Sequence, residues 1–287
     1  MPTIGITLGD PAGIGPEVVR SAIEKITLPG DTRLRIIGDE KGFTPGAPTA
    51  DSAAAAFRWL EDAAALGSKG EIDAVVTGPV SKSNMHGVGF KFPGQTEFFA
   101  ARWNSPDFAM CLTGGCLTVA LVTAHVPLAD VARLLNSDEI VRVGRLLAGF
   151  LQRRGVTRPR IAVAGLNPHA GESGDLGAEE ISIIAPAIAE LVATLPGTVF
   201  TGAHSPDTVF NGAVAGQFDG VLCMYHDQGL IPLKLHAFDE GVNVTLGLPI
   251  PRTSPDHGTA FAIAGKGIAR PDSTIAAIQL AIELTRS

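Results

Sequence analysis

The sequence contains few cysteines and few positive charges, and it has no long apolar run. Three cysteines among 287 residues form no CxxC pair, and an odd number without a disulfide framework predicts a reducing compartment. Lysine and arginine number 22 against 29 acidic residues, and this net charge of −7 argues against a dedicated nucleic-acid binder. No stretch of about 18 apolar residues and no signal peptide is recognisable. We therefore expect a cytoplasmic protein without a nucleic-acid or membrane partner.

The composition is that of an ordinary folded protein, with 45% hydrophobic and 18% charged residues. Short β-branched runs alternate with stretches rich in alanine and leucine. Strands that alternate with helices predict βαβ units and a parallel or mixed sheet in one or two domains. The expected strands are 3–9, 33–39, 73–78, 117–124, 160–166, 197–202, 220–225 and 242–249, and the expected helices are 15–26, 52–67, 128–155, 178–195 and 272–286.

A glycine-rich loop, GDPAGIGPE at residues 9–17, joins the first expected strand to the first helix. Pro16 suits the first helical turn because its missing N–H group is not needed there. The string is neither G-x-G-x-x-G nor a Walker A loop. Two interpretations stay open: the loop brings backbone N–H groups close to a ligand, or it is a tight turn.

Three expected strands are each followed by a histidine, at His125, His169 and His226. One such histidine alone is more often a hydrogen-bonded structural residue. If the strands are parallel, all three rings emerge at the same edge of one sheet. Three imidazoles with open remaining positions make a site for zinc or another divalent metal. The pattern therefore favours a metal site.

A basic and polar set follows the third histidine: Lys234, Asn243 and Arg252, spaced nine residues apart. Each lies in an apolar segment rich in glycine and proline, where an unpaired charge is costly. A bound anion would explain the set, since arginine suits bidentate contact with phosphate or carboxylate and lysine a point-charge contact. The following segment, residues 256–273, contains glycines that permit close backbone approach, and long loops of small residues are often functional.

Seven strings in order resemble the 4-hydroxythreonine-4-phosphate dehydrogenase family of vitamin B6 (pyridoxine) biosynthesis. They are GDPAGIGPE, VTGPVSK, FPGQTEFFA, GLNPHAGESG, MYHDQGLIPLK, GVNVTLGLP and RTSPDHGTAFAIAGKG. The resemblance implies an α/β, isocitrate/isopropylmalate dehydrogenase-like fold with two α/β subdomains around a central cleft. We expect residues 1–92 with 249–287 to form the cofactor-side subdomain, and residues 93–248 the metal-, substrate- and dimer-forming subdomain. A homodimer with a shared active site is also implied.

The resemblance assigns roles to individual residues. It implies one divalent metal (zinc, magnesium or cobalt) on the three histidines, and NAD or NADP near the loop after residue 256. The substrate would be a small phosphorylated hydroxy acid. The implied residues are His125, His169 and His226 for the metal; Gln95, Thr96, Lys234, Asn243 and Arg252 for the substrate; and His257, Gly258 and Thr259 for the cofactor.

Gln95 departs from the family, which has a histidine in the corresponding GHTEF string where this chain has GQTEF. A glutamine has hydrogen-bond donors and an acceptor but never a charge. Two alternatives stay open at this position. Either the substrate preference shifts from 4-hydroxy-L-threonine 4-phosphate towards a relative such as erythronate or threonate 4-phosphate, or Gln95 only replaces a hydrogen bond.

The implied reaction is oxidation of a secondary hydroxyl. The metal would lower the pKa of this hydroxyl, hydride would pass to NAD(P), and the resulting β-keto acid would lose carbon dioxide. Asp227 would orient a metal ligand or relay a proton, and Lys234 would hold the anionic end of the substrate. Asp207 is a second candidate catalytic carboxylate, or a turn residue. Rival interpretations are a phosphate acyltransferase, a sugar-phosphate sensor without activity, and a non-redox metal-dependent hydrolase or aldolase.

Overall fold

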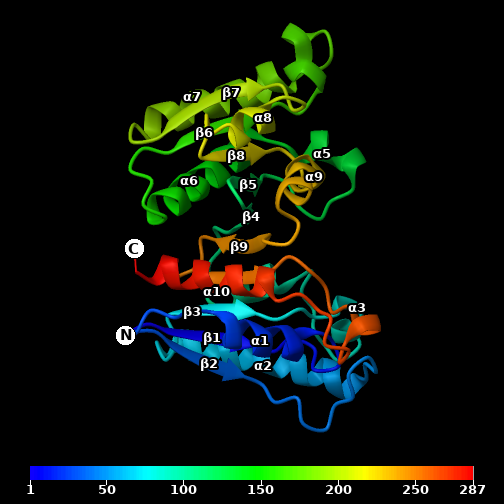
Figure 1. The fold of residues 1–287 in the computed structure, drawn as a ribbon. Helices are drawn as coiled ribbons and strands as arrows, with labels where there is room; N and C mark the ends of the chain where they lie inside the picture. Colours follow the sequence, from blue (N-terminus) through cyan, green and yellow to red (C-terminus); the bar gives the residue numbers. More distant parts are fainter. Residues whose placement is uncertain (287) are drawn as a thin grey trace. The chain divides into compact units, whose positions relative to one another are not determined.

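The computed structural model describes residues 1–286, which form two compact α/β units (Figure 1). Unit 1 consists of Met1–Pro106 and the segment that starts at Asp239, and unit 2 consists of Asp107–Phe238. The borders expected from the sequence, 92/93 and 248/249, assign α4 (Gln95–Arg102) and β9 (Val242–Leu246) to the second subdomain. In the structure both elements belong to unit 1, where β9 pairs with β10.

The sheet of unit 1 has the strand order β2-β1-β3-β10-β9. The first four strands are parallel, and β9 runs antiparallel to β10. The strand bounds are β1 (Thr3–Thr7), β2 (Arg33–Ile37), β3 (Ala74–Thr77) and β10 (Arg252–Pro255). Figure 1 shows α1 (Gly15–Lys25) and α10 (Asp272–Thr285) side by side on one face and α2 (Ala50–Ser68) on the other. A short α3 (Lys82–His86) follows β3.

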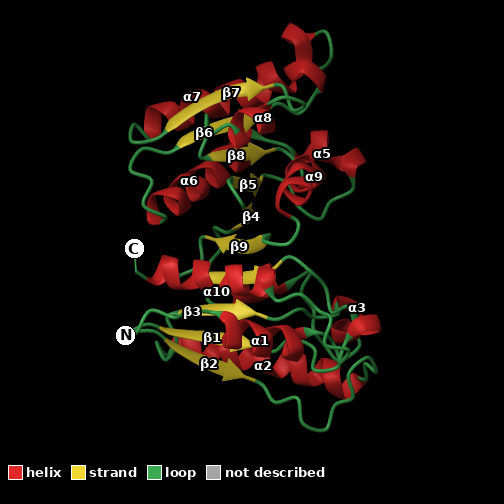
Figure 2. Ribbon diagram, viewed as in Figure 1, coloured by secondary structure: helices red, strands yellow, loops and turns green. Residues whose placement is uncertain are grey.

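The sheet of unit 2 has the order β4-β5-β8-β6-β7, with only β4 antiparallel to its neighbour (Figure 2). Its strands are β4 (Ala109–Gly114), β5 (Leu117–Leu121), β6 (Arg160–Ala164), β7 (Val199–His204) and β8 (Gly220–Cys223). Its helices are α5 (Leu128–Leu134), α6 (Ser137–Arg153), α7 (Ala185–Thr194), α8 (Val209–Val214) and α9 (His226–Ala237), with a π-helical turn at Glu180–Ile184 before α7. The expected α/β class is confirmed, and within residues 1–286 no helix has the length and apolar character needed to cross a membrane.

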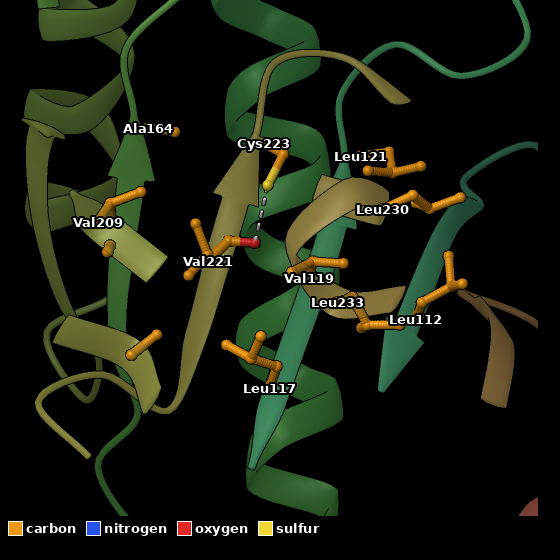
Figure 3. Close-up of a cluster of buried hydrophobic side chains, with 12 residues drawn as sticks. Leu112, Leu117, Val119, Leu121, Ala164, Val209, Val221, Cys223, Leu230 and Leu233 are labelled. Carbon is orange, nitrogen blue, oxygen red and sulfur yellow. Dashed lines mark hydrogen bonds between the residues drawn. The ribbon is translucent and has the colours of Figure 1, made fainter. Parts of the chain in front are cut away.

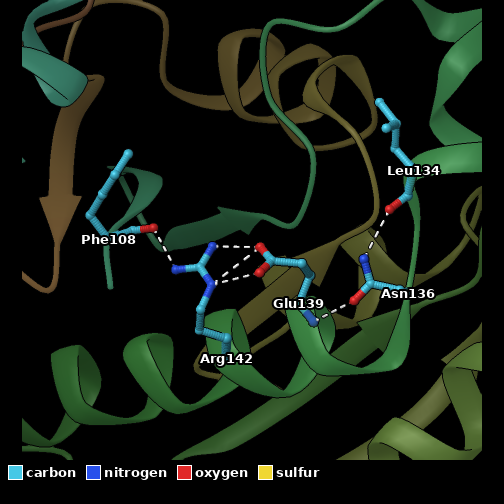
Figure 4. A network of polar contacts seen from close by, with 5 residues as sticks. All are labelled: Phe108, Leu134, Asn136, Glu139 and Arg142. Carbon is cyan, nitrogen blue, oxygen red and sulfur yellow. Dashed lines mark hydrogen bonds and ion pairs between the residues drawn. The ribbon is translucent and has the colours of Figure 1, made fainter. Parts of the chain in front are cut away.

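The single helix expected over residues 128–155 is wrong, because α5 ends at Leu134 and Asn136 caps the start of a new helix, α6 (Figure 4). Its amide nitrogen donates to the Leu134 carbonyl at 3.1 Å, and its oxygen accepts from the Glu139 N–H group at 3.0 Å as the N-cap of α6. Glu139 pairs with Arg142, which donates to the Phe108 carbonyl at 2.7 Å just before β4. The helix break therefore also fixes the start of β4.

Helix α9 covers a buried apolar cluster on one face of the unit 2 sheet (Figure 3). Leu230 and Leu233 of the helix pack against side chains of β4, β5 and β8, which include Leu112, Val119 and Cys223. This cluster anchors the helix whose first residue is His226. The position of that histidine is therefore set by core packing.

Replacing Gly229 with alanine is expected to destabilise the protein by roughly 1–2 kcal/mol, because a methyl group there would lie 3.1 Å from both Cys223 Sγ and Leu121 Cδ2. Gly149 in α6 is the matched control, since a methyl group at that exposed helical position meets no atom within 4 Å. Gly149→Ala should stabilise by about 0.5–1 kcal/mol through backbone entropy. Denaturant unfolding of both variants measures the two signs, and two changes of the same sign would contradict the packing explanation.

Candidate active site

Two of the three histidines expected to bind a metal lie together in unit 2. The rings of His125 and His226 have centroids 5.6 Å apart and an interplanar angle of 40°. His125 lies four residues after β5, and His226 lies three residues after β8 as the first residue of α9. Nδ1 of His226 lies 2.7 Å from Oδ1 of Asp227. A carboxylate on one ring nitrogen fixes the ring and leaves Nε2 for another ligand, as in many metal-binding histidines.

His169 lies in an unusual left-handed turn after β6. Its φ is 51°, and positive values continue through Ala170, Gly171, Glu172 and Ser173. Each such residue other than glycine costs about 1–2 kcal/mol. A turn of this kind persists only where surrounding contacts hold it.

The carboxylate of Asp207 has a defined hydrogen-bond partner. Ser205 donates to Oδ1 of Asp207 at 2.5 Å, and this bond, together with the charge of His169, lowers the pKa of Asp207. Within residues 1–286, no three histidine, cysteine, aspartate or glutamate side chains gather closely enough to hold a metal ion. The structure thus brings together two members of the expected set, and the third, His169, lies in the turn after β6.

Lys234 lies on α9, eight residues after His226 and therefore about two helical turns further along the same helix. The residue is half-buried. Pro232 stands between them, inside the helix. His226 and Lys234 therefore belong to one helix. The core contacts of Leu230 and Leu233 hold this helix, so the distance between the two residues along the helix axis is fixed.

Arg252 is the centre of a buried polar group in unit 1. It is 3% exposed, and it donates to the hydroxyls of Thr77 at 2.6 Å and Thr245 at 3.3 Å and to Oε1 of Gln95 at 3.2 Å. Burial lowers the pKa of the guanidinium to about 10, while the charge of Glu97 acts in the opposite direction. At neutral pH the group therefore still carries a positive charge.

Several polar atoms of this region are buried without a hydrogen-bond partner among the described residues. They are Nε of Arg252, Oδ1 of Asn243 and Oε2 of Glu97. Asn243 and Arg252 share one face of the β9–β10 pair, because Arg252 lies opposite Thr245 and Asn243 opposite Ser254. Unsatisfied buried polar atoms are rare in native proteins. Both a donor and acceptors are left open here, which fits a polar ligand carrying an anionic group.

Gln95 and Thr96 lie at the start of α4 and join this group. The amide of Gln95 donates to the Gly78 carbonyl at 3.2 Å and accepts from Arg252, so both of its ends contact the protein. The hydroxyl of Thr96 lies 3.1 Å from that of Thr245. The structure thus brings Gln95, Thr96, Asn243 and Arg252 of the expected substrate set together in unit 1, while Lys234 belongs to unit 2.

The expected cofactor residues lie in a loop that packs on the start of α1. The Thr259 carbonyl accepts from the Ile14 N–H group at 2.9 Å, and Glu17 accepts from the N–H groups of Gly265 and Ala269. Nδ1 of His257 lies 3.1 Å from the Gly258 carbonyl, and burial lowers the pKa of His257. Its Nε2 is buried without a partner among residues 1–286 and is left as an acceptor.

Glycines of the first loop are required by chain packing. Gly9 has φ +73°, and a side chain there would lie 2.3 Å from the Pro79 carbonyl oxygen. At Gly15 a methyl group would lie 1.9 Å from the Leu8 carbonyl oxygen. The tight-turn interpretation of GDPAGIGPE is therefore sufficient to explain these two positions.

A pocket of about 250 Å³ adjoins the same loop in unit 1. Gly13, Phe43, Gly265 and Gly267 line it, and an ion pair between Arg20 and Glu40 lies at its wall. Glycine backbone and an aromatic ring make a surface on which a flat apolar ring can lie.

Sequence reasoning missed three members of the Arg252 group: Thr77, Thr245 and Glu97. A threonine within a strand is ordinary, so its type gave no signal. The string GQTEF places Glu97 in the first helical turn, where an acidic residue is expected for helix reasons alone. Only the pairing of β3, β9 and β10 reveals that the two threonines face the guanidinium.

Comparisons with known proteins agree with the motifs. The family described as pyridoxal phosphate biosynthetic protein PdxA matches residues 16–281. A 4-hydroxythreonine-4-phosphate dehydrogenase of Erythrobacter litoralis is 45% identical over 98% of this chain and 96% of that protein. A D-threonate 4-phosphate dehydrogenase of Pectobacterium atrosepticum is 40% identical over 98% of each.

Solved structures give the same result. A crystal structure of 4-hydroxythreonine-4-phosphate dehydrogenase from Klebsiella pneumoniae has a TM-score of 0.83 and 38% identity, over 99% of this chain and 100% of that one. Isocitrate dehydrogenase from Methylococcus capsulatus, at 17% identity and TM-score 0.55 over 100% of this chain and 88% of that one, shares the fold. The expected dehydrogenase-like fold is thus confirmed, and the chain belongs to the PdxA family of pyridoxal phosphate biosynthetic proteins.

Proposed function

We propose that this dehydrogenase oxidises the secondary hydroxyl of a 4-phosphorylated hydroxy acid with NAD or NADP, and that the β-keto acid formed then loses carbon dioxide. The substrate is 4-hydroxy-L-threonine 4-phosphate or a close relative such as threonate or erythronate 4-phosphate. The observation that carries the proposal is the buried, charged Arg252, whose Nε has no partner among the described residues. Relatives named for phosphorylated substrates support it.

Arg252 binds the anionic group of the substrate. A buried charge without a compensating anion is costly, and a phosphate or carboxylate supplies both the opposite charge and acceptors for the open N–H group. Asn243 Oδ1 and Glu97 Oε2 are acceptors, so they bind the hydroxyl or amino hydrogens of the same molecule. Thr77, Thr245 and Gln95 hold the guanidinium in place.

His125, His169 and His226 hold one divalent metal: zinc, magnesium or cobalt. The donor chemistry of three imidazoles, the close His125–His226 pair and the Asp227 carboxylate on Nδ1 of His226 support this proposal. Because no three such side chains gather closely enough among residues 1–286, metal binding would have to draw His169 towards the pair. When bound, such a cation lowers the pKa of a coordinated hydroxyl. Asp227 orients the ring of the metal ligand His226. Imidazole suits zinc and cobalt better than magnesium.

Asp207 and Lys234 are the remaining catalytic candidates. Asp207 is held as a carboxylate by the Ser205 hydroxyl, which lowers its pKa, so it is available as a proton acceptor at neutral pH. Lys234 supplies a positive charge at the far end of α9 for the anionic end of the substrate. Both lie in unit 2 with the three histidines.

The nicotinamide cofactor binds at the loop of His257, Gly258 and Thr259. The open Nε2 of His257 accepts a hydrogen bond, and a neutral imidazole suits this role because burial lowers its pKa. The pocket beside Phe43 and Gly265 has room for a flat ring. When bound, the nicotinamide would supply the hydride acceptor, and the protein supplies position and exclusion of water. The three free thiols agree with a cytoplasmic protein.

The protein forms a homodimer through α9, with the active site at the interface between the copies. Ile231, Leu235 and Phe238 form a stripe along the helix and are 66%, 88% and 74% exposed. Spacings of four and three residues place them on one helical face. Such an apolar face is rarely left in water.

Replacing Leu235 with glutamate is therefore expected to convert the dimer to a monomer and to lower activity with it. Sedimentation velocity over a range of concentrations measures the change. Ile268→Glu is the control, because Ile268 is 62% exposed but lies in unit 1. A Leu235→Glu protein that sediments as wild type would exclude this face as the interface.

The proposed reaction is tested by following NADH or NADPH formation with a panel of 4-phosphorylated hydroxy acids, with and without chelator. Turnover that requires both the nicotinamide and the metal is expected. A non-redox hydrolase or aldolase would consume substrate in the presence of metal without any nicotinamide. A phosphate acyltransferase would be indifferent to the chelator.

Gln95 is expected to shift the substrate preference away from 4-hydroxy-L-threonine 4-phosphate, since its amide is already engaged by Gly78 and Arg252 and carries no charge. The alternative is that Gln95 only replaces a hydrogen bond. The measurement is the ranking of kcat/KM for Gln95→His and wild type on this substrate and on erythronate and threonate 4-phosphates. If wild type already prefers 4-hydroxy-L-threonine 4-phosphate and the variant keeps the ranking, the shifted preference is wrong.

A further inference from the structure

The segments after β5 and β8, which lead to two of the three histidines, are joined through one residue, Met224. Its carbonyl accepts from the Thr123 N–H group at 3.1 Å and from the Thr123 hydroxyl at 2.7 Å. Thr123 lies two residues before His125, and Met224 lies two residues before His226. The segment after β5 and the segment after β8 are thus fixed to each other by two hydrogen bonds.

Gln228 extends this connection to the third segment. It is only 6% exposed and lies in the first turn of α9. Its Oε1 accepts from the Met224 N–H group at 2.6 Å, and its Nε2 donates to the Gly165 carbonyl at 2.7 Å. Gly165 directly follows β6, four residues before His169. A single buried amide therefore joins the segments that lead to all three histidines.

The path from Gly165 to His169 is itself held by Glu180, which is 5% exposed. Oε1 of Glu180 accepts from the N–H groups of Leu166 and Asn167, both at 2.7 Å, and Oε2 accepts from the Asn167 side chain at 2.9 Å. These bonds fix the residues just before the left-handed turn. Without them the positive φ values of the turn would relax.

We infer that Gln228 is a positioning residue for the metal site: its amide sets the distance between the segment carrying His169 and the His125–His226 pair. The inference rests on the proposed function, in which these histidines share one metal. Gln228 itself makes no contact with the metal in this role. Hydrogen-bond partners that orient metal ligands typically change metal affinity 10- to 100-fold when removed.

Two variants change this amide in different ways. Gln228→Met keeps the length of the side chain but leaves the Met224 N–H group and the Gly165 carbonyl without their partner. Gln228→Glu keeps the side-chain length and the acceptor for Met224, but it places a carboxylate oxygen against the Gly165 carbonyl. It therefore breaks only the link to the His169 segment and provides a second variant if the methionine variant does not fold. Gln152→Met, at an exposed position of α6, is the matched control.

Metal-free proteins are titrated with Zn²⁺ alone by calorimetry, well below their unfolding temperatures, and the Co²⁺ forms are compared by visible absorption. We expect one Zn²⁺ per wild-type and Gln152→Met chain, an affinity lowered by about 10- to 100-fold in both Gln228 variants, and altered Co²⁺ bands. A purely structural role would lower stability but leave the Co²⁺ spectrum and the affinity of the folded variant unchanged, and this result would overturn the inference. Absence of Zn²⁺ binding in wild type would instead refute the proposed metal site.

Discussion

Replacing Arg252 with methionine is expected to lower kcat/KM by about 10- to 150-fold without lowering the stability of the ligand-free protein. The activity loss is that of a charge-assisted hydrogen bond, about 1.5–3 kcal/mol. Stability should not fall because the buried guanidinium is desolvated, which lowers the pKa of Arg252 to about 10. Below pH 10 the Arg252 guanidinium is charged in both the folded and the unfolded chain. Burying this charge therefore makes folding less favourable by roughly 3 kcal/mol at neutral pH.

The two effects are measured separately. Denaturant unfolding gives stability, and the rise of Tm with inorganic phosphate gives anion binding, which wild type should show and Arg252→Met should lack. Arg160→Met is the control, because Arg160 forms an exposed ion pair with Asp219 and should change both quantities little. A large loss of stability with a normal phosphate response would assign Arg252 a structural role.

The strand that carries Arg252 shows why the sequence predicts the residue better than its surroundings. RTSP has no β-branched run and ends in proline, so β10 was not expected from the sequence. It forms because β3 and β9 pair with it on its two sides. The charge in an apolar context could be seen from the sequence, but the hydroxyls of Thr77 and Thr245 that hold it come from strands far away in the chain.

Helix α9 was missed for the opposite reason. Gly229 and Pro232 are poor helix formers in a helix interior, so local propensity argues against a helix at residues 226–237. Tertiary packing overrides it: Leu230 and Leu233 are buried in the unit 2 core, and Gly229 permits close approach to the sheet. His226 does follow the expected strand, but it does so as the first residue of a helix that the sequence does not predict.

The turn at His169 shows a third limit of the sequence. Only Gly171 and Gly174, among six consecutive residues with positive φ, signal a left-handed conformation. The turn depends on the buried Glu180, which is separated from His169 by ten residues of irregular chain. A histidine that follows a strand can be recognised from the sequence, but the direction of its ring cannot.

Alanine at His125, His169 or His226 is expected to remove bound metal and activity together, with activity falling on the order of 1000-fold. A metal that polarises a substrate oxygen contributes several kcal/mol, and about 1.4 kcal/mol corresponds to tenfold in rate. Metal content is measured by atomic emission on the purified proteins, and activity on the substrate that wild type turns over. His86→Ala is the control, because His86 lies in unit 1 and contacts the Phe92 carbonyl.

The three variants should also differ in metal affinity in a way that the geometry sets. His125 and His226 lie together, so His169→Ala leaves this pair intact, whereas either other replacement leaves one ring of the pair. We therefore expect His169→Ala to retain the highest residual Zn²⁺ affinity and His226→Ala to lose the most, because the latter also removes the ring that Asp227 orients. Equal affinities in all three variants would show that the pair is not a preformed half of the site. Wild-type metal content in all three would show that the histidines do not bind the metal.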